Sequence, residues 1–158
     1  MSEKINQLAV EVLRTDVFDS LPDHIKKLFP KALAETGEVQ NMIIGLPLEQ
    51  GANVAYPLIS VYSKGAAEGL VGVFRHVDLY LDFWVSGFQA ANVEGRTVVA
   101  ILYEYTRRQF QDKNWSKNGV LIKRSYETSR SEVLFEPDQK IYHIANTYRV
   151  EALSKDWY

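Results

Sequence analysis

Residues 73–85 read VFRHVDLYLDFWV and carry the clearest secondary-structure signal of this 158-residue chain. Polar and aromatic side chains occupy one parity of the segment, and all but one side chain of the other parity are apolar, the exception being Arg75. The apolar parity holds Val73, Val77, Leu79, Leu81, Phe83 and Val85. The other parity holds His76, Asp78, Tyr80, Asp82 and Trp84. Because successive side chains of a strand point to opposite faces, the segment predicts an antiparallel strand with one buried and one outward face.

The residues before this strand predict two helices and two short strands. An apolar stripe runs through Ile5, Leu8, Ala9, Val12 and Leu13, at the spacing of an amphipathic helix. A second, short helix is expected from about residue 20 to Phe29, because Pro30 disfavours helical backbone in the residue before it. Short strands are expected over residues 39–44 and 57–62, and the glycine-bearing stretch 63–72 is expected to form a loop.

A long helix is expected after the central strand, from about Gln89 to Gln111. One face of it carries Phe88, Ala91, Gly95, Val98, Leu102 and Tyr105. Gly95 lies on that face, which predicts a close approach between helix and sheet, since an interior glycine costs about 1 kcal/mol relative to alanine. Two further strands are expected over residues 119–127 and 141–152. The element order predicts an α+β fold: an antiparallel sheet of four to five strands with helices mainly on one face, in one domain spanning residues 1–158.

Composition excludes several classes of function. Hydrophobic residues make up 46% of the chain and charged residues 24%, as in ordinary globular proteins. The net charge of −2 argues against a dedicated nucleic-acid-binding protein. The absence of cysteine excludes disulfides, zinc–thiolate sites and thiol catalysis. The N-terminal residues predict no signal peptide and the apolar runs are too short to span a bilayer, so we expect a protein made in the cytoplasm without membrane contact.

The sequence contains no catalytic motif, and we predict neither an enzyme nor a bound cofactor or metal. His76 and His143 both lie on predicted outward strand faces, and Asp78 and Asp82 share the face of His76. These residues could form a metal or acid–base site only if their strands were neighbours, and no metal-ligand spacing supports one. The favoured interpretation is a polar surface in contact with solvent or with another subunit.

Basic side chains are concentrated in the last third of the chain. Seven of them lie between residues 107 and 130: Arg107, Arg108, Lys113, Lys117, Lys123, Arg124 and Arg130. They are interleaved with aromatic residues, which could make a patch for nucleic acid or for an acidic protein. Alternatively, Arg107 and Arg108 complement a helix C-terminus while the others solvate a loop and a strand edge. The second interpretation is favoured because the rest of the chain is acidic.

Large aromatic residues form a third candidate feature. Trp84 is on the outward parity of the central strand, Trp115 is in a polar loop, and Trp157 and Tyr158 close the chain. Exposed aromatic side chains are enriched at protein–protein interfaces, although large aromatics also pack commonly against their own fold. The candidate interface is therefore His76, Asp78, Tyr80, Asp82, Trp84, Trp115, Trp157 and Tyr158.

Taken together, the order of these segments resembles a known family. The strand YPLISV (56–61) is followed by the strand VDLYLDFWV (77–85), a helix with Ala90-Ala91, and the closing strand IYHIANTYRV (141–150). Over about residues 8–153 this order is similar to that of the tail terminator (tail completion, or tail-to-head joining) proteins of tailed bacteriophages.

The resemblance implies a structural virion protein at the head–tail junction, assembled in the host cytoplasm. It implies a homo-oligomeric ring, commonly a hexamer, that caps the tail tube and joins it to the head connector or stopper protein. DNA passes through such a ring without sequence-specific binding. Other readings stay open: another connector, stopper or baseplate component, a small α+β ligand-binding protein or hydrolase using His76, Asp78 or His143, or a monomeric DNA-binding module using the basic segment.

Overall fold

The computed structural model describes residues 2–29, 42–44, 56–65, 74–87, 94–138 and 140–154. Its helices are α1 (Ser2–Val12), the π-helical turn η1 (Leu13–Val17), α2 (Phe18–Ser20), α3 (Asp23–Lys26) and α4 (Gly95–Phe110). Its strands are β1 (Met42–Ile44), β2 (Leu58–Gly65), β3 (Arg75–Ser86), β4 (Val120–Arg130), β5 (Leu134–Glu136) and β6 (Ile141–Ser154). No helix within these ranges is both long and apolar enough to cross a membrane.

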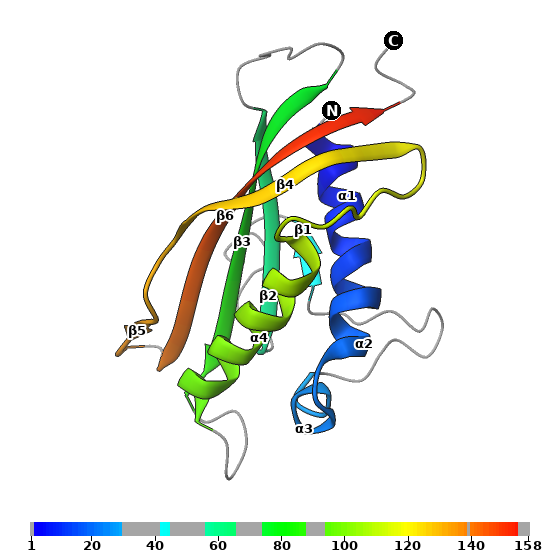
Figure 1. Cartoon of the computed structure of the whole chain (residues 1–158). Helices are drawn as coiled ribbons and strands as arrows, with labels where there is room; N and C mark the ends of the chain where they lie inside the picture. Colours follow the sequence, from blue (N-terminus) through cyan, green and yellow to red (C-terminus); the bar gives the residue numbers. More distant parts are fainter. Residues whose placement is uncertain are drawn as a thin grey trace.

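The strands form one six-stranded sheet in the order β1-β2-β3-β6-β4, with the short β5 pairing with β6 beside β4 (Figure 1). The α+β class and the antiparallel pairing are confirmed for β2, β3, β6, β4 and β5. Three details differ from the sequence prediction. The strand β2 continues through Gly65, into the stretch 63–72 that was expected to form a loop. The edge strand β1 runs parallel to β2, and β5 adds a strand that the sequence did not predict. A three-residue strand is too short to show a period-2 pattern, which explains the omission.

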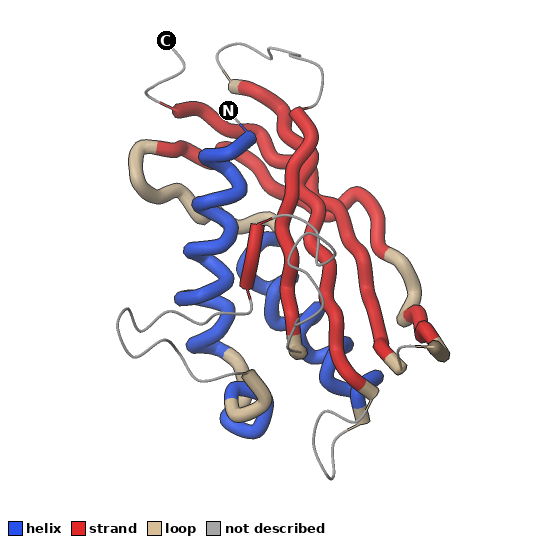
Figure 2. Tube along the Cα trace, turned by 180° about the vertical axis from the view of Figure 1, so that it is seen from behind, coloured by secondary structure: helices blue, strands red, loops and turns tan. Residues whose placement is uncertain are grey.

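The helices cover one face of this sheet, as predicted (Figures 1 and 2). The long helix α4 packs on β3 and β6, and α1 packs on β1, β2 and β3. The apolar stripe of α1 and η1 forms part of the core: Ile5, Ala9 and Leu13 are all at 0% exposure. On β3 the inward side chains are equally inaccessible: Val77, Leu79, Leu81, Phe83 and Val85. Each contributes about 1.5–3 kcal/mol through burial, so the alternation predicted for this strand is the main support of the core.

Gly95 confirms the expected close approach of helix and sheet, although it is the first residue of α4 rather than an interior one. A Cβ atom there would lie 2.5 Å from the Ser86 carbonyl oxygen and 2.8 Å from Cδ2 of Tyr142. No ordinary side chain fits at those distances, so only glycine lets the helix start against the ends of β3 and β6. The predicted turns before Gly95, including Phe88 and Ala91, lie outside the described residues.

Candidate functional site

The outer face of the sheet, which α1 and α4 leave uncovered, is divided into two halves. The aromatic half consists of Tyr62, Tyr80, Trp84 and His143 around Asp82. The charged half consists of Lys64, His76, Asp78, Arg149 and Glu151. Both follow from the strand register, in which Tyr80 lies opposite Tyr62, Trp84 opposite His143, and Asp78 opposite Arg149. The predicted outward residues of β3 therefore do lie on one face, but at two chemically different places.

In the aromatic half, the rings stack on one another across strands. Tyr62 and Tyr80 are parallel to within 6°, with ring centroids 4.7 Å apart, and Trp84 and His143 are parallel to within 6° at 3.7 Å. Nε1 of Trp84 donates to Oγ of Ser60 at 3.4 Å. All four ring side chains are half-buried. Much of the surface of each ring is thus covered by its stacking partner, and only the remaining part of each ring is accessible from outside.

Asp82 is buried, which corrects its assignment to the exposed face. Its exposure is 6%, because it lies between the two stacked pairs and opposite the small residues Ser60 and Ala145. Burial raises the pKa of its carboxyl group to about 6. The Asp82 charge in turn helps to raise the pKa of Tyr62, after burial as the main cause. Asp82 is therefore enclosed by the aromatic half and is not accessible as a surface contact residue.

Cross-strand ion pairs join the residues of the charged half. Nε of Arg149 donates to Oδ1 of Asp78 at 3.3 Å, and Nδ1 of His76 lies 3.9 Å from Oε1 of Glu151. These pairs are partly exposed, a situation in which ion pairs contribute little to stability. They hold Asp78, His76, Arg149 and Glu151 in defined positions on the outer face.

The histidines do not form a joint site. His143 lies opposite Trp84, eight residues along β3 from His76, which corresponds to about 26 Å. Burial lowers the pKa of His143, so the neutral imidazole is favoured there. Within the described residues, no three His, Asp or Glu side chains are grouped as metal ligands. The structure therefore does not support the metal or acid–base interpretation of His76, Asp78 and His143.

A half-buried polar cluster on the opposite face was missed by the sequence analysis. Oε2 of Glu127 accepts hydrogen bonds from the Tyr103 hydroxyl at 2.6 Å and from Nδ2 of Asn146 at 3.2 Å. The backbone N–H of Glu127 donates to Oε1 of Gln111 at 2.7 Å. These bonds join α4 to β4 and β6. Only the long-range pairing of these strands creates the cluster, and its one sequence signal is the polar Asn146 on the otherwise apolar parity of β6.

The tyrosines of this cluster are poor candidates for catalysis. Burial and the hydrogen bond to Glu127 raise the pKa of Tyr103 to about 12. Burial, followed by the charge of Glu127, also raises the pKa of Tyr148. Both phenols stay protonated at neutral pH, so neither acts as a base. The cluster fastens the helix to the sheet.

Trp115 is buried in the core, so its prediction as an exposed interface residue is wrong. Its exposure is 4%, and its ring packs against Phe110 at 4.8 Å. The loop after α4 is held against α1 and η1, where Lys117 Nζ contacts Asp16 at 2.9 Å and Asn118 Nδ2 donates to Glu11 at 2.6 Å. This folding back places the indole inside. The other two aromatic candidates, Trp157 and Tyr158, lie outside the described residues.

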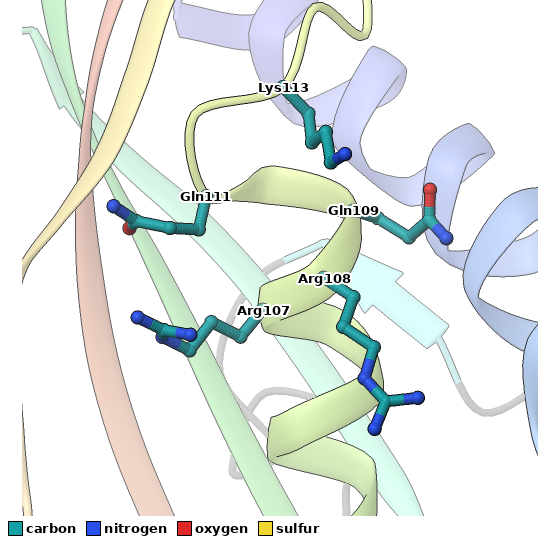
Figure 3. Close-up of a pocket in the computed structure, with 5 residues that line it drawn as sticks. All are labelled: Arg107, Arg108, Gln109, Gln111 and Lys113. Atoms are coloured by element: carbon teal, nitrogen blue, oxygen red, sulfur yellow. The ribbon is translucent and has the colours of Figure 1, made fainter.

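The predicted basic patch is dispersed. Arg107, Arg108 and Lys113 line a shallow hollow at the C-terminus of α4 with Gln109 and Gln111, but Arg107 and Arg108 point in different directions (Figure 3). Lys117 is paired with Asp16. The other basic side chains lie over aromatic rings: Lys123 over Phe74, Arg124 over Tyr126 and Arg130 over Tyr103. Three of these seven basic residues therefore share one place, and the other four pair with an acid or lie over aromatic rings.

Exposed apolar side chains gather at the edges of the sheet, a feature that the sequence analysis did not identify. Within the described residues the large exposed hydrophobics are Ile44 (44%), Leu121 (45%), Leu134 (48%) and Phe135 (46%). Ile44 is on β1, at one edge of the sheet, and the other three are on β4 and β5, at the opposite edge. Which strands are edges depends on sheet order, and a single sequence does not reveal that order.

The sequence matches no protein-family model and no curated protein. The fold, however, is similar to that of a chain in the virion of a native gene transfer agent (GTA) particle. The TM-score is 0.55 at 11% sequence identity, and the match covers 86% of this chain and 90% of that chain. At this identity the likeness shows a shared fold, and it extends over nearly the whole of both chains.

Proposed function

We propose that this chain is a structural, non-enzymatic virion protein that assembles as a ring, commonly a hexamer, to cap a phage tail tube and join it to the head connector. The observation that carries the proposal is the fold shared with a chain of a GTA virion, which leaves little of either chain unmatched. The order of segments that resembles tail terminators agrees with it. In this proposal the tail tube protein and the connector or stopper protein are the partners, and DNA crosses the lumen without sequence-specific contacts.

The geometry of the surface supports an assembly role over catalysis. Within the described residues, His76 and His143 are far apart, the buried tyrosines stay protonated, and three of the seven basic side chains line one hollow while the other four are dispersed. The groups with capacity for contact are flat stacked rings, paired charges and apolar edges. These are typical of surfaces that meet other proteins.

Tail tubes provide a direct test. We expect the purified protein to give a ring in negative-stain images, alone or at the ends of isolated tail tubes, with a mass by light scattering of several times 18.1 kDa. A persistent monomer that never decorates tube ends would refute the capping role. Rings on connectors or baseplates but not on tubes would instead favour another ring component of the same particle. Binding to free DNA should be weak at physiological salt, whereas steeply salt-dependent binding would support the DNA-binding alternative.

A further inference from the structure

Asp82 and His143 are two polar side chains enclosed close together in the aromatic half. Asp82 lies opposite Ala145 on β6, and His143 is the next outward residue along that strand. Among the described residues, no hydrogen bond or ion pair joins the Asp82 carboxyl to another side chain, and Nε2 of His143 is buried without a hydrogen-bond partner. A buried polar group without a partner costs free energy, and a buried charge without one costs much more. Both groups therefore gain from contact with water.

The outer face offers Asp82 no nearby cation among the described residues. Three titratable side chains face it from β2, β3 and β6: Tyr62, Tyr80 and His143. None is a cation at neutral pH, because burial lowers the pKa of His143. Lys64 and Arg149 both lie opposite Asp78, four residues along β3, which corresponds to about 13 Å. Burial therefore raises the pKa of Asp82 to about 6 without an opposing charge.

Of the two stacked pairs beside Asp82, the Trp84–His143 pair gains more from opening. The hydrogen bond from Nε1 of Trp84 to Oγ of Ser60 is 3.4 Å long, whereas the usual length for N–H donors is about 2.7–3.2 Å. Movement of these two rings away from Asp82 brings both the carboxyl and Nε2 of His143 to water. Movement of the tyrosine pair would hydrate the carboxyl alone.

We propose that the Trp84–His143 stack is a gate on the outer face, closed while Asp82 is protonated and open when Asp82 ionises and takes up water. A hydrated aspartate has an ordinary pKa of 3.8, about two pH units below the value in the closed arrangement, so ionisation favours the open arrangement by up to ~100-fold. The aromatic half thus has two states that interchange in the pH range below neutrality. This gate goes beyond the proposed function and does not depend on a ring.

Solvent exchange of the Trp84 indole N–H measures the opening, because the closed arrangement holds this N–H against Ser60. Its NMR signal is identified with Trp84→Phe. The exchange rate of the wild type is divided by that of Asp82→Asn at the same pH, which cancels the intrinsic effect of pH on exchange. We expect a ratio of about 1 near pH 4.5 and of up to ~100 near pH 8. A ratio that stays at about 1 overturns the gate.

Two controls separate the gate from other changes. Asp78→Asn removes an acid of the same strand that is bonded to Arg149, and its Trp84 exchange should follow the wild type at every pH. Loss of the pH dependence in this variant overturns the role of Asp82. The Trp115 indole is buried in the core and should exchange equally in wild type and Asp82→Asn. If both indoles accelerate together, the whole domain opens and the gate is overturned.

Chemical modification tests the second enclosed group. Diethyl pyrocarbonate acylates a neutral imidazole that reaches solvent, and His76 in the charged half is the reference within the same molecule. Relative to Asp82→Asn, the ratio of His143 to His76 modification should rise by up to ~100-fold between about pH 5 and about pH 8, as located by mass spectrometry. No rise overturns the gate. An NMR titration that places the pKa of His143 above its ordinary value also overturns it, because the imidazole would then carry the counter-charge of Asp82 inside a closed stack.

Discussion

The two faces of β3 are built from neighbouring residues and are stabilised in different ways. Toward the helices, Phe83 and its inward neighbours are fully buried in one continuous core. Toward the outside, Trp84 and Tyr80 are half-buried and pack mainly against single partners on the adjacent strands. The inward face supplies the stability of the fold, and the outward face organises a surface. Substitutions along this one strand should therefore fall on a graded scale.

Phe83→Ala should have the largest effect. Phe83 is at 0% exposure and contacts Tyr103 edge-to-face at 6.3 Å, so truncation leaves a cavity under α4. We expect a loss of about 3–5 kcal/mol in the free energy of unfolding. Urea denaturation measures it, and Trp84→Ala, the next residue on the strand, is the matched comparison. An equal loss for both residues would contradict the proposed difference between the faces.

Glu127→Ala should have the second-largest effect on stability, because it removes the acceptor of the polar cluster that joins α4 to β4 and β6. It leaves the Tyr103 hydroxyl and Nδ2 of Asn146 without the acceptor they share. A buried donor without an acceptor costs about 1–3 kcal/mol, and because these two bonds are only partly buried we expect a loss of about 2 kcal/mol in total. The exposed Glu132→Ala is the control, with no expected change. A Tyr103→Phe, Glu127→Ala double variant should be less than additive, and additivity would argue against a shared network.

Asp82→Asn should change how stability depends on pH. The pKa of Asp82 is raised to about 6 in the folded state, above its ordinary value of 3.8, so the folded state binds the proton more tightly than the unfolded state. Wild-type stability should therefore fall as pH rises from about 4 to about 6, and the contribution of the neutral carboxyl is lost above that range. Asparagine stays neutral, so the variant should lack this fall and be more stable by about 2 kcal/mol at pH 7.

Unfolding curves at several pH values compare the two proteins. Other titrating groups, including His143, are present in both and cancel in the difference. Asp78→Asn, in the charged half of the same strand, is the control and should not reproduce the effect. A pH-independent difference between wild type and Asp82→Asn would show that the acid is not desolvated.

The parts of this structure that the sequence predicts are those with a local signal. The alternation around Leu79 and Leu81 and the helical stripe around Leu8 identify elements and their buried faces, because periodicity is a property of neighbouring residues. The burial of Trp115, by contrast, depends on a loop folding back onto α1. The edge position of Phe135 depends on β6 entering the sheet between β3 and β4. Long-range pairing decides both, and no pattern within a dozen residues encodes it.

The difference between local patterns and long-range pairing also explains which parts of the candidate surface the sequence predicted. Parity alone assigned His76, Asp78, Tyr80, Asp82 and Trp84 to one face, and the register confirms that they share it. Parity does not reveal what lies on the adjacent strands. Stacked rings on both sides bury Asp82, whereas Asp78 is half-buried and accepts a hydrogen bond from Arg149. The interface role of this face stays a prediction.

The stacked pair Tyr62–Tyr80 should give the smallest effect. The rings are 4.7 Å apart and nearly parallel, and each side chain is half-buried. A double-mutant cycle of Tyr62→Ala and Tyr80→Ala should yield a coupling of about 1 kcal/mol, the usual size for an aromatic pair. Self-association of both single variants should be measured beside their stability, because the predicted interface role of this face makes the two rings candidates for a subunit contact. Loss of assembly with unchanged stability would support an interface role of the aromatic half, and normal assembly of both variants would argue against that role.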